Sequence, residues 1–322
     1  MKRHNRLSMK MIPQVTLALF AGILFWPNAS KAQQDPMYTH YMYNTLSVNP
    51  AYAGSRDALT ITGITRHQWV GLEGAPTTQT ITTHTPILSE KLGAGLSFVS
   101  DRIGPISTAI FSADLSYQVK VSEKANLSFG LKGGFNYRQG NLSNLQTTDA
   151  LDPSFENNIQ SDLLPNFGFG MYYSTERYYA GVSVPKLLQN NFSTGQAVVS
   201  SSDPAAEKRH YFLIGGAIFP ISSALLFKPT TLVKVVENAP LEVDFTANFL
   251  IFEKVWLGAM YRSRDAVGAL LGYQFTEQLK FGYSLDFATT RLISTQSGTH
   301  EVMLTYDFLF KTQGKIKSPR YF

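Results

Sequence analysis

The chain has 322 residues, of which 44% are hydrophobic and 16% charged, and it is rich in aromatic residues, with 22 Phe and 16 Tyr. It has no cysteine, which excludes a disulfide framework, a zinc–thiolate site, a cysteine nucleophile and a lipid anchor on cysteine. Five of the 28 basic residues and none of the 23 acidic ones lie in the first 32 residues, so the remainder is balanced and offers no basic excess for nucleic acid.

Residues 1–32 have the parts of a secretory signal peptide. An apolar stretch, Val15–Phe25, follows several basic residues, and Ser30–Ala32 supplies small residues at a cleavage site. The stretch is shorter than the roughly 20 residues that a membrane-spanning helix needs, which disfavours the alternative of an N-terminal anchor. No later stretch comes near the length of a transmembrane helix. The basic residues of this segment are Lys2, Arg3, Arg6, Lys10 and Lys31.

The next segment, residues 33–58, has no strand-like alternation. Gln33–Gly54 (QQDPMYTHYMYNTLSVNPAYAG) is rich in tyrosine and asparagine and holds two prolines. It is either a packing segment or a docking surface for a partner, since tyrosine offers a large contact area at low entropic cost. The partner-binding candidates in it are Asp35, Pro36, Tyr38, Tyr41, Tyr43, Asn44, Asn49, Pro50, Tyr52 and Gly54.

Residues 59–310 alternate between apolar and polar side chains with a period of two. For example, Val243 and Phe245 alternate with Glu242 and Asp244. Runs of about ten residues with one apolar and one polar face are typical of strands in a membrane barrel. The fourteen expected strands are Leu59–Trp69, Thr77–Ile87, Leu92–Asp101, Ser107–Val119, Ala125–Gln139, Asn166–Ser174, Arg177–Val184, Arg209–Phe219, Thr230–Val236, Leu241–Phe252, Lys254–Arg262, Ala266–Phe275, Leu279–Phe287 and Thr299–Phe310.

The connections between these strands support a transmembrane barrel. Outer-membrane barrels have an even number of strands, short periplasmic turns and longer outer loops. All the even-to-odd connections are short, whereas the two longest connections, Gly140–Pro165 and Pro185–Lys208, are odd-to-even. A soluble sandwich would also alternate, but the length, the signal peptide and the strand number argue against it.

We therefore predict an all-β fold, in which one antiparallel barrel of about 14 strands crosses the outer membrane of a Gram-negative bacterium. Closure is required because open strand edges cannot be satisfied in lipid. The N-terminus is expected in the periplasm, with segment 33–58 at the periplasmic mouth or folded back into the lumen. Residues 311–322 are expected to form a C-terminal tail. An interfacial aromatic girdle is predicted from Tyr172, Tyr173, Tyr178, Tyr179 and Trp256.

Arg66–Gln79 (RHQWVGLEGAPTTQ) contains the first outer loop with its flanks. Its glycines and proline are turn residues. Trp69 fits equally a girdle residue and an anchor at an interface. The partner-binding candidates in this loop are Trp69, Gly71, Leu72, Glu73, Gly74 and Pro76.

The search for catalytic motifs is mostly negative. Five of the six histidines follow the signal peptide, none of them in a metal-ligand spacing, and G-x-S-x-G and P-loop motifs are absent. His67 and His84 lie on adjacent expected strands with Asp57 nearby, which leaves a barrel hydrolase as an alternative. We expect no catalysis, no metal and no cofactor, because polar lumen residues are what any such barrel needs.

Six segments carry a resemblance to a known family, and they are spread over nearly the whole mature chain. On them the chain resembles the PorP/SprF family of the type IX secretion system of Bacteroidota. The segments are Gln34–Arg56, Gln68–Gln79, Tyr261–Leu271, Phe281–Asp286, Gly298–Phe308 and Ser318–Phe322.

The resemblance implies a non-enzymatic outer-membrane barrel that works with a secretion machine. The implied partners are periplasmic ring and translocon components, and a secreted adhesin, such as one used in gliding, or its C-terminal sorting domain. The lipid bilayer would surround the barrel. The residues by themselves also allow a passive porin for small solutes.

Overall fold

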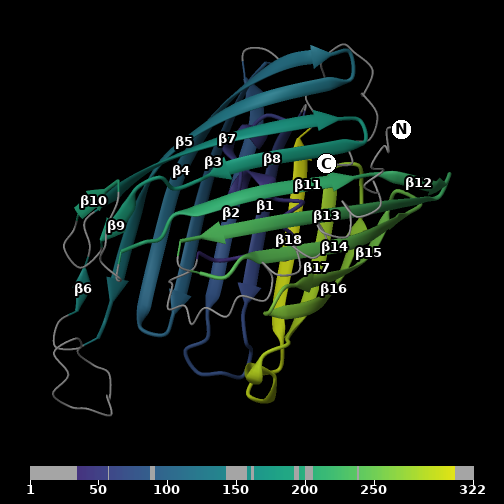
Figure 1. The fold of residues 1–322 in the computed structure, drawn as a ribbon. Coiled ribbons are helices and arrows are strands. Elements are labelled where there is room, and N and C mark those ends of the chain that lie inside the picture. Colours follow the sequence, from purple (N-terminus) through teal and green to yellow (C-terminus); the bar gives the residue numbers. More distant parts are fainter. Residues whose placement is uncertain are drawn as a thin grey trace, which may run out of the picture.

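The structure, a computed structural model, describes residues 35–56, 58–87, 91–142, 158–160, 163–191, 196–199, 206–237 and 239–308. It forms one closed antiparallel barrel of 14 wall strands (Figure 1). These wall strands, with β11 and β12 counted as one, are β1 (Leu59–His67), β2 (Thr77–Ile87), β3 (Leu92–Ile103), β4 (Ile106–Ser122), β5 (Ala125–Gly140), β7 (Leu164–Thr175), β8 (Tyr178–Val184), β11 (His210–Ala217) continued by β12 (Phe219–Ser222), β13 (Leu225–Val236), β14 (Glu242–Ile251), β15 (Val255–Arg262), β16 (Ala266–Gln274), β17 (Leu279–Ala288) and β18 (Thr299–Phe308).

The barrel closes where its first and last strands meet. β1 pairs with β18 along its whole length, from Leu59 opposite Phe308 to His67 opposite His300. The purple and yellow strands of Figure 1 therefore lie side by side. Each wall strand is hydrogen-bonded to a neighbour on both sides, and β11 joins β8 to β13. The described wall thus leaves no strand edge open to lipid, as a membrane barrel requires.

The predicted strands agree with the observed ones in number and order. Thr77–Ile87 matches β2 at both ends. The largest difference is the ninth strand, which was predicted from Thr230 and begins at Leu225. Pro229 lies within it, opposite the break between β11 and β12, where the strand pairing is already interrupted. A proline is tolerated at such an irregularity because its missing N–H breaks no regular ladder.

The two faces of the wall divide as predicted. Side chains that face outward and are more than half exposed include Ile81, Leu96, Phe111, Leu115 and Leu131. Buried side chains that face inward include Thr60, Thr62, Thr78, Thr80 and Thr82. An apolar exterior around a polar lining is the arrangement of a barrel whose solvent outside is lipid.

The two ends of the barrel differ in the length of their connections. At one end, the short-turn end, residues 123–124 join β4 to β5 and residues 176–177 join β7 to β8. The connections that follow β1, β5 and β8 leave from the other end, the long-loop end, where two tight turns also lie. The two longest contain the short strands β6 (Ile159–Gln160), β9 (Gln189–Asn191) and β10 (Gln196–Val198). By the rule for outer-membrane barrels, we expect the short-turn end to face the periplasm.

The predicted aromatic girdle is partly wrong. Tyr173 and Tyr178 are exposed beside a short turn, as expected. Tyr172, Tyr179 and Trp256 instead point into the lumen and are buried. Counting in steps of two from the outward-facing Phe residues of β7 places Tyr172 on the inner face, so this error was avoidable.

Several predictions fall outside the described residues. They concern the signal peptide, the first residues of segment 33–58, the last two residues of the fourteenth strand and the tail 311–322. Asp57 is also outside them. Within the part of the chain that the structure describes, no helix has the length and apolar character to cross a membrane.

Candidate functional site

Residues 35–56, which we call the lumen segment, lie inside the barrel. Nearly all of its side chains from Tyr38 to Ala53 are buried. Its hydrogen bonds reach β1, β2, β4, β7, β8, β14, β17 and β18. A segment in contact with strands on all sides of the wall occupies the lumen.

The lumen segment runs from the long-loop end to the short-turn end. At its start, Asp35 pairs with Lys186 (Oδ1–Nζ 2.9 Å), which lies just beyond the outer end of β8. At its other end, Arg56 pairs with Asp307 (Nη1–Oδ1 3.4 Å), next to the last residue of β18. Asp35 therefore lies at the long-loop end, although it precedes a first strand that starts at the short-turn end.

The ion pair of Asp35 and Lys186 at the long-loop end is held in its charged form. Burial by itself would raise the pKa of Asp35, but the ammonium of Lys186 and the ring of His210 outweigh this effect and lower the pKa to about 2. Burial would likewise lower the pKa of Lys186, but the carboxylates of Asp35 and Glu207 raise it. Both partners thus stay ionised at neutral pH.

A chain without cysteine makes this orientation directly measurable. Asp35→Cys should react with a membrane-impermeant maleimide added to intact cells, because that side chain is 31% exposed at the long-loop end. Glu73→Cys, in the first outer loop, is the positive control. Lys124→Cys, in a short turn, should react only after lysis. If intact cells label Lys124→Cys and not Asp35→Cys, the assigned orientation is wrong.

Two 3-10 turns shape the middle of the lumen segment: η1 (Thr45–Ser47) and η2 (Pro50–Tyr52). Asn49 caps η2, since its Oδ1 accepts a hydrogen bond from the amide of Ala51 (3.0 Å). Its Nδ2 donates to the carbonyl of Met171 on β7 (2.9 Å). Proline follows the cap at the first turn position, where its missing N–H leaves nothing unsatisfied. One asparagine thus shapes the segment and ties it to the wall.

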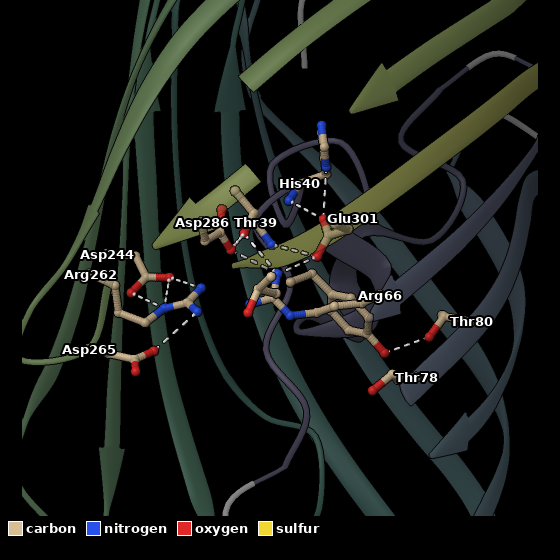
Figure 2. A network of polar contacts seen from close by, with 12 residues as sticks. Thr39, His40, Arg66, Thr78, Thr80, Asp244, Arg262, Asp265, Asp286 and Glu301 are labelled. Carbon is tan, nitrogen blue, oxygen red and sulfur yellow. Dashed lines mark hydrogen bonds and ion pairs between the residues drawn. The ribbon is translucent and has the colours of Figure 1, made fainter. Parts of the chain in front are cut away.

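A buried polar cluster, the Glu301 cluster (Thr39, His40, Arg66, Asp286 and Glu301), holds the outer half of the segment (Figure 2). Glu301 accepts hydrogen bonds from the amides of Thr39 (3.0 Å) and His40 (2.8 Å). It also contacts His40 Nδ1 (2.8 Å) and Arg66 Nη1 (3.0 Å). Arg66 reaches Asp286 (3.0 Å) as well. The cluster joins the segment to three neighbouring strands, β1, β18 and β17.

Further charged pairs line the same half of the lumen. Arg262 on β15 binds Asp244 on β14 through Nε and Nη2 (2.9 and 2.8 Å), and it lies near Asp265 (Figure 2). Alternation places Arg66, Asp244 and Arg262 on the polar face of their strands, so sequence reasoning could have named them as lumen residues. It could not pair them, because pairing depends on register and on the path of the lumen segment.

An apolar cluster holds the remainder of the lumen segment, from Tyr41 to Tyr52. Tyr41, Leu46, Val48, Ala51 and Tyr52 pack on wall residues. The ring of Tyr52 meets the ring of Tyr172 edge to face, with centroids 5.5 Å apart. This packing explains why the wall tyrosines that were predicted in the girdle face inward. The wall residues of the cluster are Tyr172, Tyr179, Phe212, Ile214 and Leu232.

Two wall glycines allow the segment's backbone to approach. A Cβ atom at Gly130 on β5 would overlap the amide of Ala51, and one at Gly93 on β3 would overlap the carbonyl of Ala53. The hydroxyl of Ser116 donates to the same Ala53 carbonyl (2.6 Å). The wall is therefore shaped for this segment at positions distant in sequence.

The partner-binding candidates of the lumen segment are mostly inaccessible in this arrangement. Their burial favours packing as their role, and a direct contact with a partner stays a prediction. The half-buried candidates are Asp35, Pro36, Tyr43 and Gly54. The buried candidates are Tyr38, Tyr41, Asn44, Asn49, Pro50 and Tyr52.

The first outer loop is exposed and structured. Its residues 68–76 hydrogen-bond to the connection 289–298, and we call these two segments the outer loop pair. The amide of Val70 donates to Gly298 (2.8 Å), and that of Ser297 donates to Val70 (2.7 Å). Trp69 is half-buried with a positive φ of 50°, and Gly71 has a φ of 97°. Of the candidates in this loop, Pro76 is half-buried, and those exposed are Gly71, Leu72, Glu73 and Gly74.

Apolar side chains stand exposed on the outer loop pair. Val70 and Leu72 are 38% and 37% exposed, and Ile293, in the other segment of the pair, is 58% exposed. Sequence reasoning missed Val70 and Ile293, because one apolar residue in a loop carries no signal without its neighbours. All three lie on the outer loop pair, at the long-loop end of the barrel.

The residues of the hydrolase alternative do not come together. His67 lies at the outer end of β1, opposite Thr77, whereas His84 lies near the inner end of β2, opposite Thr60. His84 Nδ1 accepts a hydrogen bond from the amide of Gly54 (3.2 Å), which is a structural role. Within the described ranges, no three residues of His, Cys, Asp or Glu are grouped as a metal site.

Comparison with known proteins gives a family match and distant structural neighbours. The family model described as "Type IX secretion system membrane protein PorP/SprF" matches residues 30–306. No curated protein sequence matches the chain. A Pseudomonas aeruginosa FadL homologue is 12% identical with a TM-score of 0.45, over 89% of this chain and 98% of its own. The CymD monoaromatic hydrocarbon channel is 10% identical (TM-score 0.47; 84% and 94% covered), and the KdgM porin 9% (0.36; 77% and 99%).

Proposed function

Because the chain belongs to the PorP/SprF family of type IX secretion system membrane proteins, we propose that it is a non-enzymatic outer-membrane component of this system. Its short-turn end associates with periplasmic ring and translocon components. Its long-loop end supports the export or surface attachment of cargo proteins such as gliding adhesins. The observation that carries the proposal is the family match over residues 30–306.

The filled lumen supports this role over that of a passive porin. A porin needs a continuous water-filled path, whereas the lumen segment crosses the barrel from end to end. The segment is seated by ion pairs and also by an apolar cluster. Withdrawing it would expose that cluster to water, which disfavours a plug that leaves easily.

The outer loop pair is the surface that we assign to the cargo or its C-terminal sorting domain. Exposed apolar side chains rimmed by polar residues are typical of protein contact sites. Val70, Leu72 and Ile293 provide such side chains beside Trp69. In this proposal, the candidate residues of the lumen segment do not contact a partner, and their role is to keep the lumen of the barrel filled.

Placing charge on this face should impair export. The double variant Val70→Asp/Leu72→Asp should weaken cargo binding roughly a hundredfold or more, because burying each of the two unpaired carboxylates costs about 1.4 kcal/mol or more. The amount of cargo on the cell surface, by immunoblot, measures this. Val199→Asp changes an exposed valine in another outer connection and is the matched control. If the variant no longer shows the heat-modifiable gel mobility of a folded barrel, the loop is required for folding and not for cargo binding.

The first test is affinity purification of the chain from native outer membranes in mild detergent, followed by mass spectrometry. Enrichment of type IX ring and translocon proteins, together with a large secreted protein, is the expected result, and it would name the cargo. Recovery of the barrel alone would refute the accessory role and direct attention to the porin alternative.

A further inference from the structure

A cavity of about 90 Å³ remains between the lumen segment and the wall strands β2–β5. It is large enough for several waters, since one water needs about 10–15 Å³ by this measure. It lies in the outer half of the barrel, because its lining includes Asp35, Pro36 and Lys186 from the long-loop end. Molecules from the exterior are therefore its natural source.

The walls of this cavity are unusually apolar for a barrel lumen. Val99 on β3 and Ile110 on β4 occupy inward-facing positions, where most neighbours are Ser or Thr. Both are only half-buried, so the lumen segment does not cover them. Val48 and Phe212 line the opposite side. Since inward positions of such barrels are ordinarily polar, this apolar lining calls for an apolar occupant.

The charged groups that line the cavity are already paired. Lys132 binds Asp114 (Nζ–Oδ1 3.0 Å). Lys186 binds Asp35 (2.9 Å) and Glu207 (3.3 Å). A charged molecule would have to break one of these pairs or remain uncompensated in a poorly solvated space, and both are unfavourable. The occupant should therefore be uncharged.

One polar group at the cavity is unused. Ser97 lines it, and among the described residues the buried Oγ of Ser97 has no hydrogen-bond partner. Buried hydroxyls are normally paired, and an unpaired one is unfavourable. Rotation of the Ser97 side chain about χ1 would turn its hydroxyl toward the cavity, where an occupant with one hydroxyl or N–H group would satisfy it.

We propose that this cavity is a binding site for a small, uncharged, mainly apolar molecule with a single hydrogen-bonding group, about the size of a substituted benzene ring. The molecule enters from the long-loop end and lies between Val99, Ile110 and Phe212, with its polar group near Ser97. This site is separate from the outer loop pair and does not depend on the secretion role.

Binding of 4-fluorophenol to the full barrel in lipid nanodiscs, followed by ¹⁹F NMR with empty nanodiscs subtracted, tests the site. Saturable binding of one molecule per barrel is expected. Ile110→Trp, which fills the cavity, should lower the affinity at least about tenfold. Ile81→Trp makes the same change on the lipid-facing side and should leave binding unchanged. Equal binding to both variants, or uptake no greater than in empty nanodiscs, would overturn the proposal.

Two comparisons test the chemistry of the occupant. Ser97→Ala should lower the affinity for 4-fluorophenol by about two- to tenfold, the effect of one hydrogen bond, and leave that for fluorobenzene unchanged. 4-Fluorobenzoate should bind at least about tenfold more weakly than 4-fluorophenol, and equal binding would contradict an uncharged occupant. Should Ile110→Trp give no heat-modifiable barrel, Val99→Phe fills the same space from the neighbouring strand.

Discussion

Deletion of residues 35–54 should convert a barrel that passes no ions into an open channel. With the lumen segment present, its buried backbone and side chains block the lumen from end to end. Without it, the inward-facing threonines of β1 and β2 face an empty lumen, and a polar lining of this kind holds water. We expect no conductance steps from the full chain and discrete steps of ion conductance from the deletion variant.

Single-channel recording in planar bilayers measures this effect. The full chain should be silent, and the deletion variant should conduct once its heat-modifiable mobility shows a folded barrel. Gly133→Ala, a wall substitution with no close backbone neighbour, is the control and should stay silent. Conductance in the full chain would restore the porin alternative. The same variant, purified with its partners, tests direct docking: loss of ring proteins from a folded barrel would assign their docking to residues 35–54.

Replacement of Glu301 by Ala should lower the free energy of unfolding by roughly 3–5 kcal/mol, the usual effect of removing one partner from a buried ion pair. Glu301 is fully buried and accepts hydrogen bonds from Thr39, His40 and Arg66. Its loss leaves the buried amides of Thr39 and His40 without their acceptor, whereas Arg66 keeps Asp286 and the hydroxyl of Thr39 as partners. The outer half of the lumen segment should loosen as a result.

Urea unfolding in lipid vesicles gives the change in free energy directly. Glu277→Ala, in an exposed short turn, is the matched control and should change it by less than about 0.5 kcal/mol. Glu301→Gln keeps the size and one acceptor oxygen, so we expect an intermediate loss. If Glu301→Ala is as stable as the control, the cluster does not hold the segment. Cysteine labelling at position 35 would then show whether the segment has moved.

The sequence alone was sufficient for the wall of this barrel. Alternation in steps of two assigns a side to each residue, because successive side chains of a strand point to opposite faces. The lengths of the connections then assign the two ends, as the short turns at residues 123–124 and 176–177 illustrate. Both signals are local, so a strand such as β2 could be predicted at both ends.

The contents of the barrel were decided only by the tertiary structure. Segment 33–58 has no periodicity, so its path depends on contacts such as Thr39 with Glu301, which are 262 residues apart in sequence. The position of its first described residue at the long-loop end follows from the pair of Asp35 and Lys186, which no local pattern indicates. The inward tyrosines, the Glu301 cluster and the apolar cavity exist only once this path is known. Local alternation determines which way a side chain points, and only the closed lumen determines what it meets there.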